Sequence, residues 1–263
     1  MRGVLLAVFW LSGVAGYGAQ SQAAPEPELA FEVASVKPNT TLDRIVSVNR
    51  TPAGGLDAVN VSVRMLITFS YRIRDEQLFG APGWLDTDRY DIHAKAPAGG
   101  PARTDFFDTT GTDRVRLRTR ALLADRFGLR LRSETRELPV YVLTVAKHGS
   151  KPALKRWQEG DEPGPQNIGQ ANSYTAKKVS MKAFAEGYLS SRMGRVVLDQ
   201  TGLSGDFNFK LEFEPDQAGQ GATDLTGPTF LDALEGQLGL KMEPRKGPVK
   251  VLVIEHVERP SAN

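Results

Sequence analysis

The chain has 263 residues, with 33 lysines and arginines against 31 aspartates and glutamates, and no cysteine. Because the charges nearly balance, the sequence argues against an obligate nucleic-acid binder, which carries a larger basic excess. The lack of cysteine excludes disulfides, iron–sulfur clusters, thiolate zinc sites and cysteine nucleophiles. A hydrophobic content of 40% is enough for a core and excludes a wholly disordered protein.

The N-terminus is typical of a secretory signal peptide. Arg2 supplies one positive charge, the stretch Gly3–Gly18 is uncharged, and Ser21-Gln22-Ala23 fits a cleavage site. The apolar stretch is short and contains four glycines, which argues against an uncleaved membrane anchor. We therefore expect a signal peptide over residues 1–23. We also expect a mature protein that is exported, periplasmic or secreted, and without an integral membrane segment.

Two parts of the mature chain resemble each other, at an offset that drifts from 118 to 109 residues. The clearest matches are Asn60–Leu66 with Lys178–Phe184, Tyr90–Ile92 with Phe207–Phe209, and Pro139–Val145 with Pro248–Ile254. Since the matches keep their order along the chain, the sequence predicts an internal duplication.

Each copy predicts the element order β-α-β-β-α-β-β. Ser62 and Ser180 stand at the expected N-cap of the first helix in their copies, because a serine hydroxyl can accept a hydrogen bond from an unpaired N–H of the first turn. Gly128 and Gly239 are suited to end the second helix in a left-handed conformation. A terminal hairpin, rich in β-branched residues, is expected to close each copy.

The predicted fold class is α+β, with two tandem repeats of two helices against small sheets. The expected domains are residues 28–150 and 170–258. A linker rich in proline and glycine, residues 151–169, would join them. Long loops are expected at equivalent places in the two copies, over residues 97–112 and 215–228.

Several segments resemble a soil-bacterium-associated family of exported proteins, expanded in acidobacteria, whose function is unknown. They are Phe31–Asn39, Gly80–Leu85, Ala121–Phe127, Glu134–Tyr141 and Asp199–Gly205. The resemblance covers nearly the whole mature chain and implies an exported protein without an assigned activity. Some relatives look fused to, or encoded near, sensor-type membrane metallopeptidases, which implies a partner of that kind.

The architecture of each copy is also similar to the secretin/TonB short N-terminal domain. In the second copy the similar elements are Val196–Asp199, Gly202-Leu203, Phe207–Leu211 and Phe230–Leu240. That family implies a protein-docking domain of the envelope without catalytic residues. The expected loops are longer than that small domain usually carries.

The sequence provides no catalytic, cofactor-binding or metal-binding constellation. The three histidines, His93, His148 and His256, lack the local spacing of metal ligands. The run Gly202–Gly205 differs from a nucleophile elbow, since its second glycine comes one place early. The carboxylates Asp86, Asp88 and Asp91 lack the glycine and glutamate of a calcium loop.

Two features leave alternatives open. Residues 114–136 hold eight arginines, which form either the solvated face of a helix or a patch for anionic polymers. Trp84, in a Pro-Gly-Trp-Leu turn, either plugs the end of a sheet or anchors an interface.

The sequence favours an exported, non-enzymatic docking module of the cell envelope, although it leaves open whether the protein is an enzyme. The expected partner is an envelope protein, either a membrane metallopeptidase-type sensor or an outer-membrane machine, and no cofactor or nucleic acid is expected. The candidate partner-binding residues are Trp84, Asp86, Asp88 and Arg89. The alternative is a hydrolase or carbohydrate-active protein with two carboxylates in a cleft between the repeats.

Overall fold

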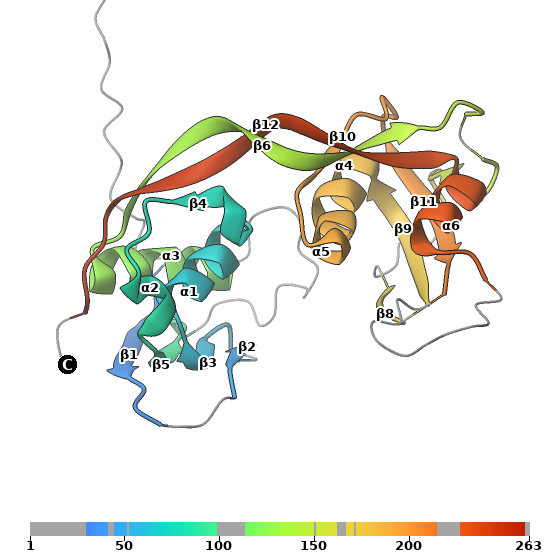
Figure 1. Ribbon diagram of the computed structural model, residues 1–263. Coiled ribbons are helices and arrows are strands. Elements are labelled where there is room, and N and C mark those ends of the chain that lie inside the picture. Colours follow the sequence, from blue (N-terminus) through green and yellow to red (C-terminus); the bar gives the residue numbers. More distant parts are fainter. Residues whose placement is uncertain are drawn as a thin grey trace, which may run out of the picture.

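The computed structural model describes residues 30–41, 45–51, 53–98, 114–149, 151–161, 167–170, 172–214 and 227–260. These residues form three four-stranded sheets and two groups of helices (Figure 1), which confirms the α+β fold class. The expected signal peptide, residues 1–23, lies outside the described residues, as do most of the two expected loops.

The first lobe contains an antiparallel sheet in the order β1-β5-β3-β2. Its strands are β1 (Val33–Pro38), β2 (Ser47–Arg50), β3 (Leu56–Val61) and β5 (Tyr90–Lys95). Helices α1 (Val63–Tyr71) and α3 (Arg114–Phe127) lie between this sheet and the long strands β6 and β12 (Figure 1). Between α1 and β5 the chain forms the short elements η2 (Asp75–Gln77), β4 (Leu78–Phe79) and α2 (Trp84–Thr87).

The second lobe repeats the same strand order, as β7-β11-β9-β8. Its strands are β7 (Lys155–Arg156), β8 (Asn167–Gln170), β9 (Ser173–Ser180) and β11 (Asp206–Glu212), so β7 lies within the segment expected to be a linker. One continuous helix comprises α4 (Met181–Ala183), the π-helical η3 (Phe184–Leu189) and α5 (Ser190–Met193). The other comprises α6 (Phe230–Ala233) and the π-helical η4 (Leu234–Leu238).

The two lobes share a central sheet that we call the bridge. Its long strands, β6 (Arg130–Val145) and β12 (Leu240–His256), pair antiparallel along their whole length (Figure 1). Strand β10 (Val197–Asp199) of the second lobe runs parallel to β6, and β4 of the first lobe runs parallel to β12. The resulting order is β10-β6-β12-β4.

The expected terminal hairpins are therefore wrong, because each copy ends in one uninterrupted strand. A tight hairpin needs turn residues that adopt positive φ. The middle of β6 has none, and Gly247 in β12 does not adopt a positive φ. The prolines at positions 139, 244 and 248 fit a continuous strand because they lie where β6 or β12 has only one strand neighbour.

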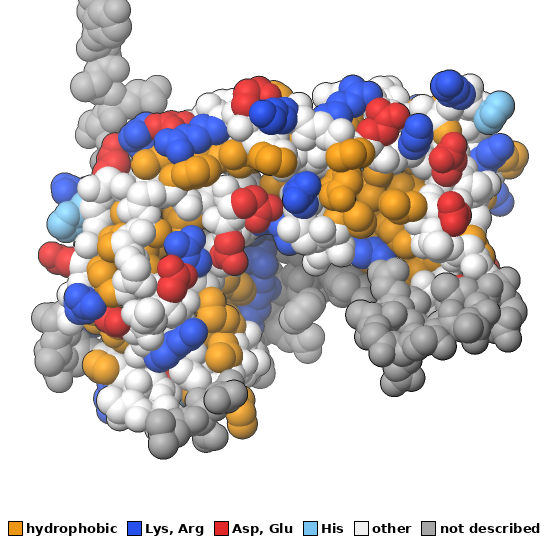
Figure 2. All heavy atoms as spheres, in the orientation of Figure 1, with side chains coloured by type: hydrophobic (Ala, Val, Ile, Leu, Met, Phe, Trp, Pro, Cys, Tyr) orange, Lys and Arg blue, Asp and Glu red, His pale blue; other side chains and the backbone are white. Residues whose placement is uncertain are grey.

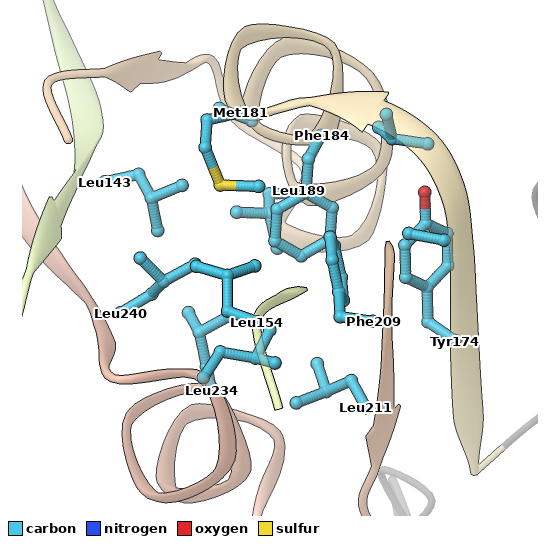
Figure 3. Close-up of a cluster of buried hydrophobic side chains, with 14 of the residues drawn as sticks. Leu143, Leu154, Tyr174, Met181, Phe184, Leu189, Phe209, Leu211, Leu234 and Leu240 are labelled. Atoms are coloured by element: carbon cyan, nitrogen blue, oxygen red, sulfur yellow. The ribbon is translucent and has the colours of Figure 1, made fainter. Parts of the chain in front are cut away.

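Each long strand contributes to both lobes. Strand β6 begins in the first core, with Leu131 and with Leu129 just before the strand, and ends in the second core with Leu143. Strand β12 runs the other way, from Leu240 in the second core to Leu252 and Ile254 in the first. Figure 3 shows Leu143 and Leu240 beside Met181 and Leu234 in the second core. Neither hydrophobic core is therefore complete without the other half of the chain.

A third, smaller core lies on the bridge itself. It is made of Val140 and Val142 from β6, Val249 and Val251 from β12, and Val196 before β10. Phe79 of β4 and Leu198 of β10 pack against it from the two lobes. The Arg136 guanidinium lies 4.1 Å from the centre of the Phe79 ring. This core joins the short strands of both lobes to the bridge.

The structure confirms the predicted N-caps of the first helices and the predicted glycine ends of the second helices. The Ser62 hydroxyl accepts a hydrogen bond from the Met65 N–H at 3.2 Å, and the Ser180 hydroxyl accepts one from the Ala183 N–H at 3.1 Å. Both second helices end at a glycine in the left-handed region, Gly128 and Gly239, with φ of 58° and 67°.

The lobes also share an uncommon backbone feature that the sequence did not reveal. Asn60 in β3 and Lys178 in β9 adopt φ of 54° and 56°, a conformation that costs free energy in residues other than glycine. In each case the backbone N–H donates to a side-chain oxygen of the neighbouring strand, Asp91 Oδ1 at 2.9 Å or Asn208 Oδ1 at 2.8 Å. The same local solution therefore occurs at the same place in both sheets.

The packing of the third core predicts that Gly247→Ala destabilises the protein. A Cβ at Gly247 would lie 2.9 Å from Leu198 Cδ1 and 3.2 Å from Val140 Cγ2. Overpacking of this kind costs about 1–3 kcal/mol, and we expect the free energy of unfolding in urea to fall by that amount. The matched control is Gly83→Ala, since a Cβ at Gly83 meets nothing within 4 Å. Equal stability of the two variants would contradict the packing described for the bridge.

Candidate docking surface

The candidate residues Trp84, Asp86, Asp88 and Arg89 all lie on or beside the short helix α2 of the first lobe. Leu85 fixes this helix to the lobe, because its side chain is fully buried in the first core. Trp84 packs against the same core but is only partly buried. One part of the side chain therefore packs on the core and another part faces solvent, and the role of Trp84 as an interface anchor stays a prediction.

Asp86 is held by an arginine of helix α1. Arg64 Nε lies 2.5 Å from Asp86 Oδ1, and Arg64 Nη2 lies 3.2 Å from Asp86 Oδ2. This two-point geometry orients both side chains more strictly than a single contact would. The Asp86 side chain is 47% exposed, so the pair lies at the surface.

Asp88 and Trp84 both contact Arg259, which lies in the segment after β12. Arg259 Nε donates to Asp88 Oδ2 at 2.8 Å, and the guanidinium lies 5.1 Å from the centre of the Trp84 ring. Arg89 points to helix α1 instead, where its Nη1 lies 3.7 Å from the sulfur of Met65. The hydrogen bond from Arg259 is the main reason why the pKa of Asp88 lies below its usual range.

The structure thus brings the four candidate residues together and adds two that the sequence analysis missed, Arg64 and Arg259. We call these six residues the Trp84 surface. Arg259 is 171 residues from Asp88 along the chain, and no local pattern marks it. The result is an aromatic ring and charged groups on and beside α2, which are contacted by one arginine from α1 and one from the segment after β12.

Other residues singled out in the sequence have structural partners. His93 Nδ1 lies 2.6 Å from Asp57 Oδ1, with both side chains largely exposed, and His256 Nε2 lies 3.7 Å from Glu258 Oε2. Within the described ranges, no three histidine, aspartate or glutamate residues are grouped closely enough to hold a metal ion. In the same part of the chain, no helix is both long and apolar enough to cross a membrane.

The arginines of α3 are not simply a solvated face, which corrects that interpretation. Arg118 is only 4% exposed and donates from Nη1 to the Gly54 carbonyl at 3.1 Å. Arg116 and Arg120 lie over the rings of Phe69 and Tyr71, at 5.1 and 4.5 Å from the ring centres. The reason is that α3 packs against both the sheet and α1, so its guanidinium groups stack on aromatic neighbours.

The Asp88–Arg259 contact predicts a pH dependence of stability. Because folding lowers the pKa of Asp88, its ionised form stabilises the folded state at neutral pH, and this contribution is lost as the pH falls through the lowered pKa. We expect Asp88→Asn to lower the urea midpoint at pH 7, by an amount that shrinks below about pH 4. Arg259→Ala should show the same convergence with wild type. A difference that persists undiminished at pH 2 would contradict this role for the contact.

Comparison with known proteins identifies the family. The family model described as "Protein of unknown function (DUF3738)" matches residues 64–257, from α1 to just beyond the end of β12. No curated protein and no solved structure matches the chain. The associations with export, acidobacteria and the secretin/TonB short N-terminal domain stay predictions. Since the match covers well over half of its length, the chain belongs to the DUF3738 family.

Proposed function

We propose that this protein is an exported, non-enzymatic docking module of the cell envelope, and that the Trp84 surface receives a partner protein. The observation that carries the proposal is a partly exposed tryptophan with the Arg259 guanidinium 5.1 Å from the centre of its ring, on a surface that also carries Arg64 and Arg89. Tryptophan and arginine are enriched among the residues that contribute most to protein–protein binding. Because Arg64 and Arg259 already hold Asp86 and Trp84 in place, little side-chain entropy is lost on binding.

The proposed partner is an envelope protein, either a membrane metallopeptidase-type sensor or an outer-membrane machine. This choice follows the sequence resemblances. The Trp84 surface itself carries both signs of charge. Arg64, Arg89 and Arg259 are positive, and Asp86 and Asp88 are negative. A partner with similarly mixed charges would fit it better than a uniformly charged polymer would.

The hydrolase alternative has less support from the described residues. A glycosidase mechanism needs two carboxyl groups on either side of the bond to be cleaved. One face of the β6–β12 pair turns toward the cores of the two lobes. Between the lobes, the exposed side chains on this face include one carboxylate, Glu137, together with Lys246 and Lys250. In addition, the described carboxyl groups with a shifted pKa (Asp88, Asp91 and Glu243) are all shifted downward, whereas a general acid needs a raised pKa.

Site-specific photo-cross-linking in the native envelope tests the docking function. A photoreactive residue placed at Thr87, which is exposed in α2, should give a discrete adduct with one protein. The additional change Trp84→Ala should reduce the adduct yield at least about tenfold, since removing a central aromatic anchor typically costs 2 kcal/mol or more.

The chain offers a matched control for this experiment. Trp157 is also partly buried and also carries a cation over its ring, with Lys178 Nζ 4.1 Å from the ring centre, but it lies in the second lobe. Trp157→Ala should therefore leave the adduct intact, and a photoreactive residue at the exposed Lys147 should not form it. The proposal fails if the adduct is absent, or if both tryptophan variants reduce it equally.

A further inference from the structure

Strand β6 has a free edge on the side away from β12. In the described part of the chain, β10 pairs with β6 only over residues 141–143, so β12 is the one strand neighbour of the rest of β6. The Tyr141 N–H donates to the Val196 carbonyl, and the Leu143 carbonyl accepts a hydrogen bond from the Gln200 N–H. Because backbone groups alternate in direction along a strand, the odd-numbered residues of β6 turn theirs away from β12.

Three successive outward positions of this edge are exposed and carry a backbone N–H. They are Ser133, Thr135 and Glu137. Among the described residues, no strand pairs with their outward backbone groups. A row of such N–H and C=O groups at the edge of a sheet is a template on which another strand can pair.

The opposite edge of the bridge is closed in the same region. Figure 2 shows this bridge from one face, with charged side chains along it. On β12 the even-numbered residues point outward, because the Lys250 carbonyl accepts a hydrogen bond from Gln77 Nε2 at 2.9 Å. Pro244 and Pro248 also occupy outward positions, and proline has no N–H to donate. Another strand can therefore pair with the edge of β6 but not with the middle of β12.

The order of charges along β6 indicates which strand fits this edge. Glu134 contacts the arginines on either side of it on the same face, Arg132 and Arg136, with Arg136 Nε 2.8 Å from Glu134 Oε2. When a second copy of β6 lies antiparallel to the first about Thr135, Glu134 of each copy stands opposite Arg136 of the other. Side chains approach most closely in such pairs, where opposite charges stabilise the pairing. The Arg136 guanidinium has further N–H donors for this second carboxylate.

The same register pairs the outward backbone groups of the two copies. Thr135 then lies opposite Thr135 of the other copy, and Ser133 lies opposite Glu137, so their N–H and C=O groups hydrogen-bond across the axis. The Ser133 hydroxyl can also donate to the Glu137 carboxylate of the other copy. An axis two residues earlier, at Ser133, would instead place Arg130 opposite Arg136, and like charges destabilise such a pair.

We propose that the protein forms a two-fold symmetric dimer in which β6 of one copy pairs antiparallel with β6 of a second copy, centred on Thr135. A two-fold dimer uses one surface that is complementary to itself. The free edge of β6 meets this condition both in its backbone groups and in its charges. The bridges of the two copies then join into one continuous sheet. This inference does not use the Trp84 surface, so the dimer and the proposed docking function can fail separately.

Sedimentation velocity of the purified chain over a range of concentrations tests the dimer. The wild-type chain should show a concentration-dependent equilibrium between monomer and dimer. Thr135→Pro removes an outward N–H but no hydrogen bond to β12, and it should weaken the dimer at least about tenfold, because two hydrogen bonds across the axis are lost. The matched control is Lys246→Pro, at an outward position of the closed edge, which should leave the dimer unchanged. Far-UV circular dichroism should show that both variants are folded.

A pair of charge reversals tests the register. Glu134→Arg and Arg136→Glu each turn the two attractive pairs of the dimer into repulsive ones, so each variant alone should dimerise at least about tenfold more weakly. When the two variants are mixed, the arginines of one copy face the glutamates of the other, and a heterodimer should form. Mixing cannot restore the contacts that each substitution breaks within its own chain, so recovered association identifies the interface.

Three outcomes would overturn the proposal. The first is a wild-type chain that stays monomeric at every concentration. The second is a dimer that Thr135→Pro and Lys246→Pro weaken equally. The third is a pair of folded charge variants that do not associate when they are mixed.

Discussion

Strands β6 and β12 hydrogen-bond to each other along their whole length, and each end of that pair closes a different hydrophobic core. This pairing imposes a constraint on everything else in the fold. The first lobe needs Leu252 and Ile254 from the last strand of the chain, and the second lobe needs Leu143 from a strand that follows the first lobe. The two lobes have the same strand order, but neither can bury its apolar surface alone. Each core stays partly exposed to water until β6 and β12 have paired.

The bridge also fixes the two lobes relative to each other. Phe79 from the first lobe and Leu198 from the second pack on the same third core, and Gly247 lets the side chains of Leu198 and Val140 approach β12 closely. A packed core of this kind resists deformation more than a linker of equal length would.

The sequence predicts those parts of the fold that depend on neighbouring residues. Serine N-caps, glycine ends and alternating strands are local, so Ser62, Ser180, Gly128 and Gly239 could be assigned from spacing alone. The pairing of β6 with β12 is not local, and each strand was expected to fold back on itself instead. For the candidate surface, Trp84 and its acidic neighbours were identified from one short segment. Their arginine partners were not, because Arg64 and Arg259 come from distant positions that carry no distinguishing pattern.

The proposed duplication explains why a comparison between the lobes is informative. Each lobe has a residue other than glycine at positive φ, Asn60 in β3 and Lys178 in β9. In both lobes the N–H of this residue donates to a side-chain oxygen of the adjacent strand. Two unrelated sheets would have little reason to share such a costly conformation at the same position.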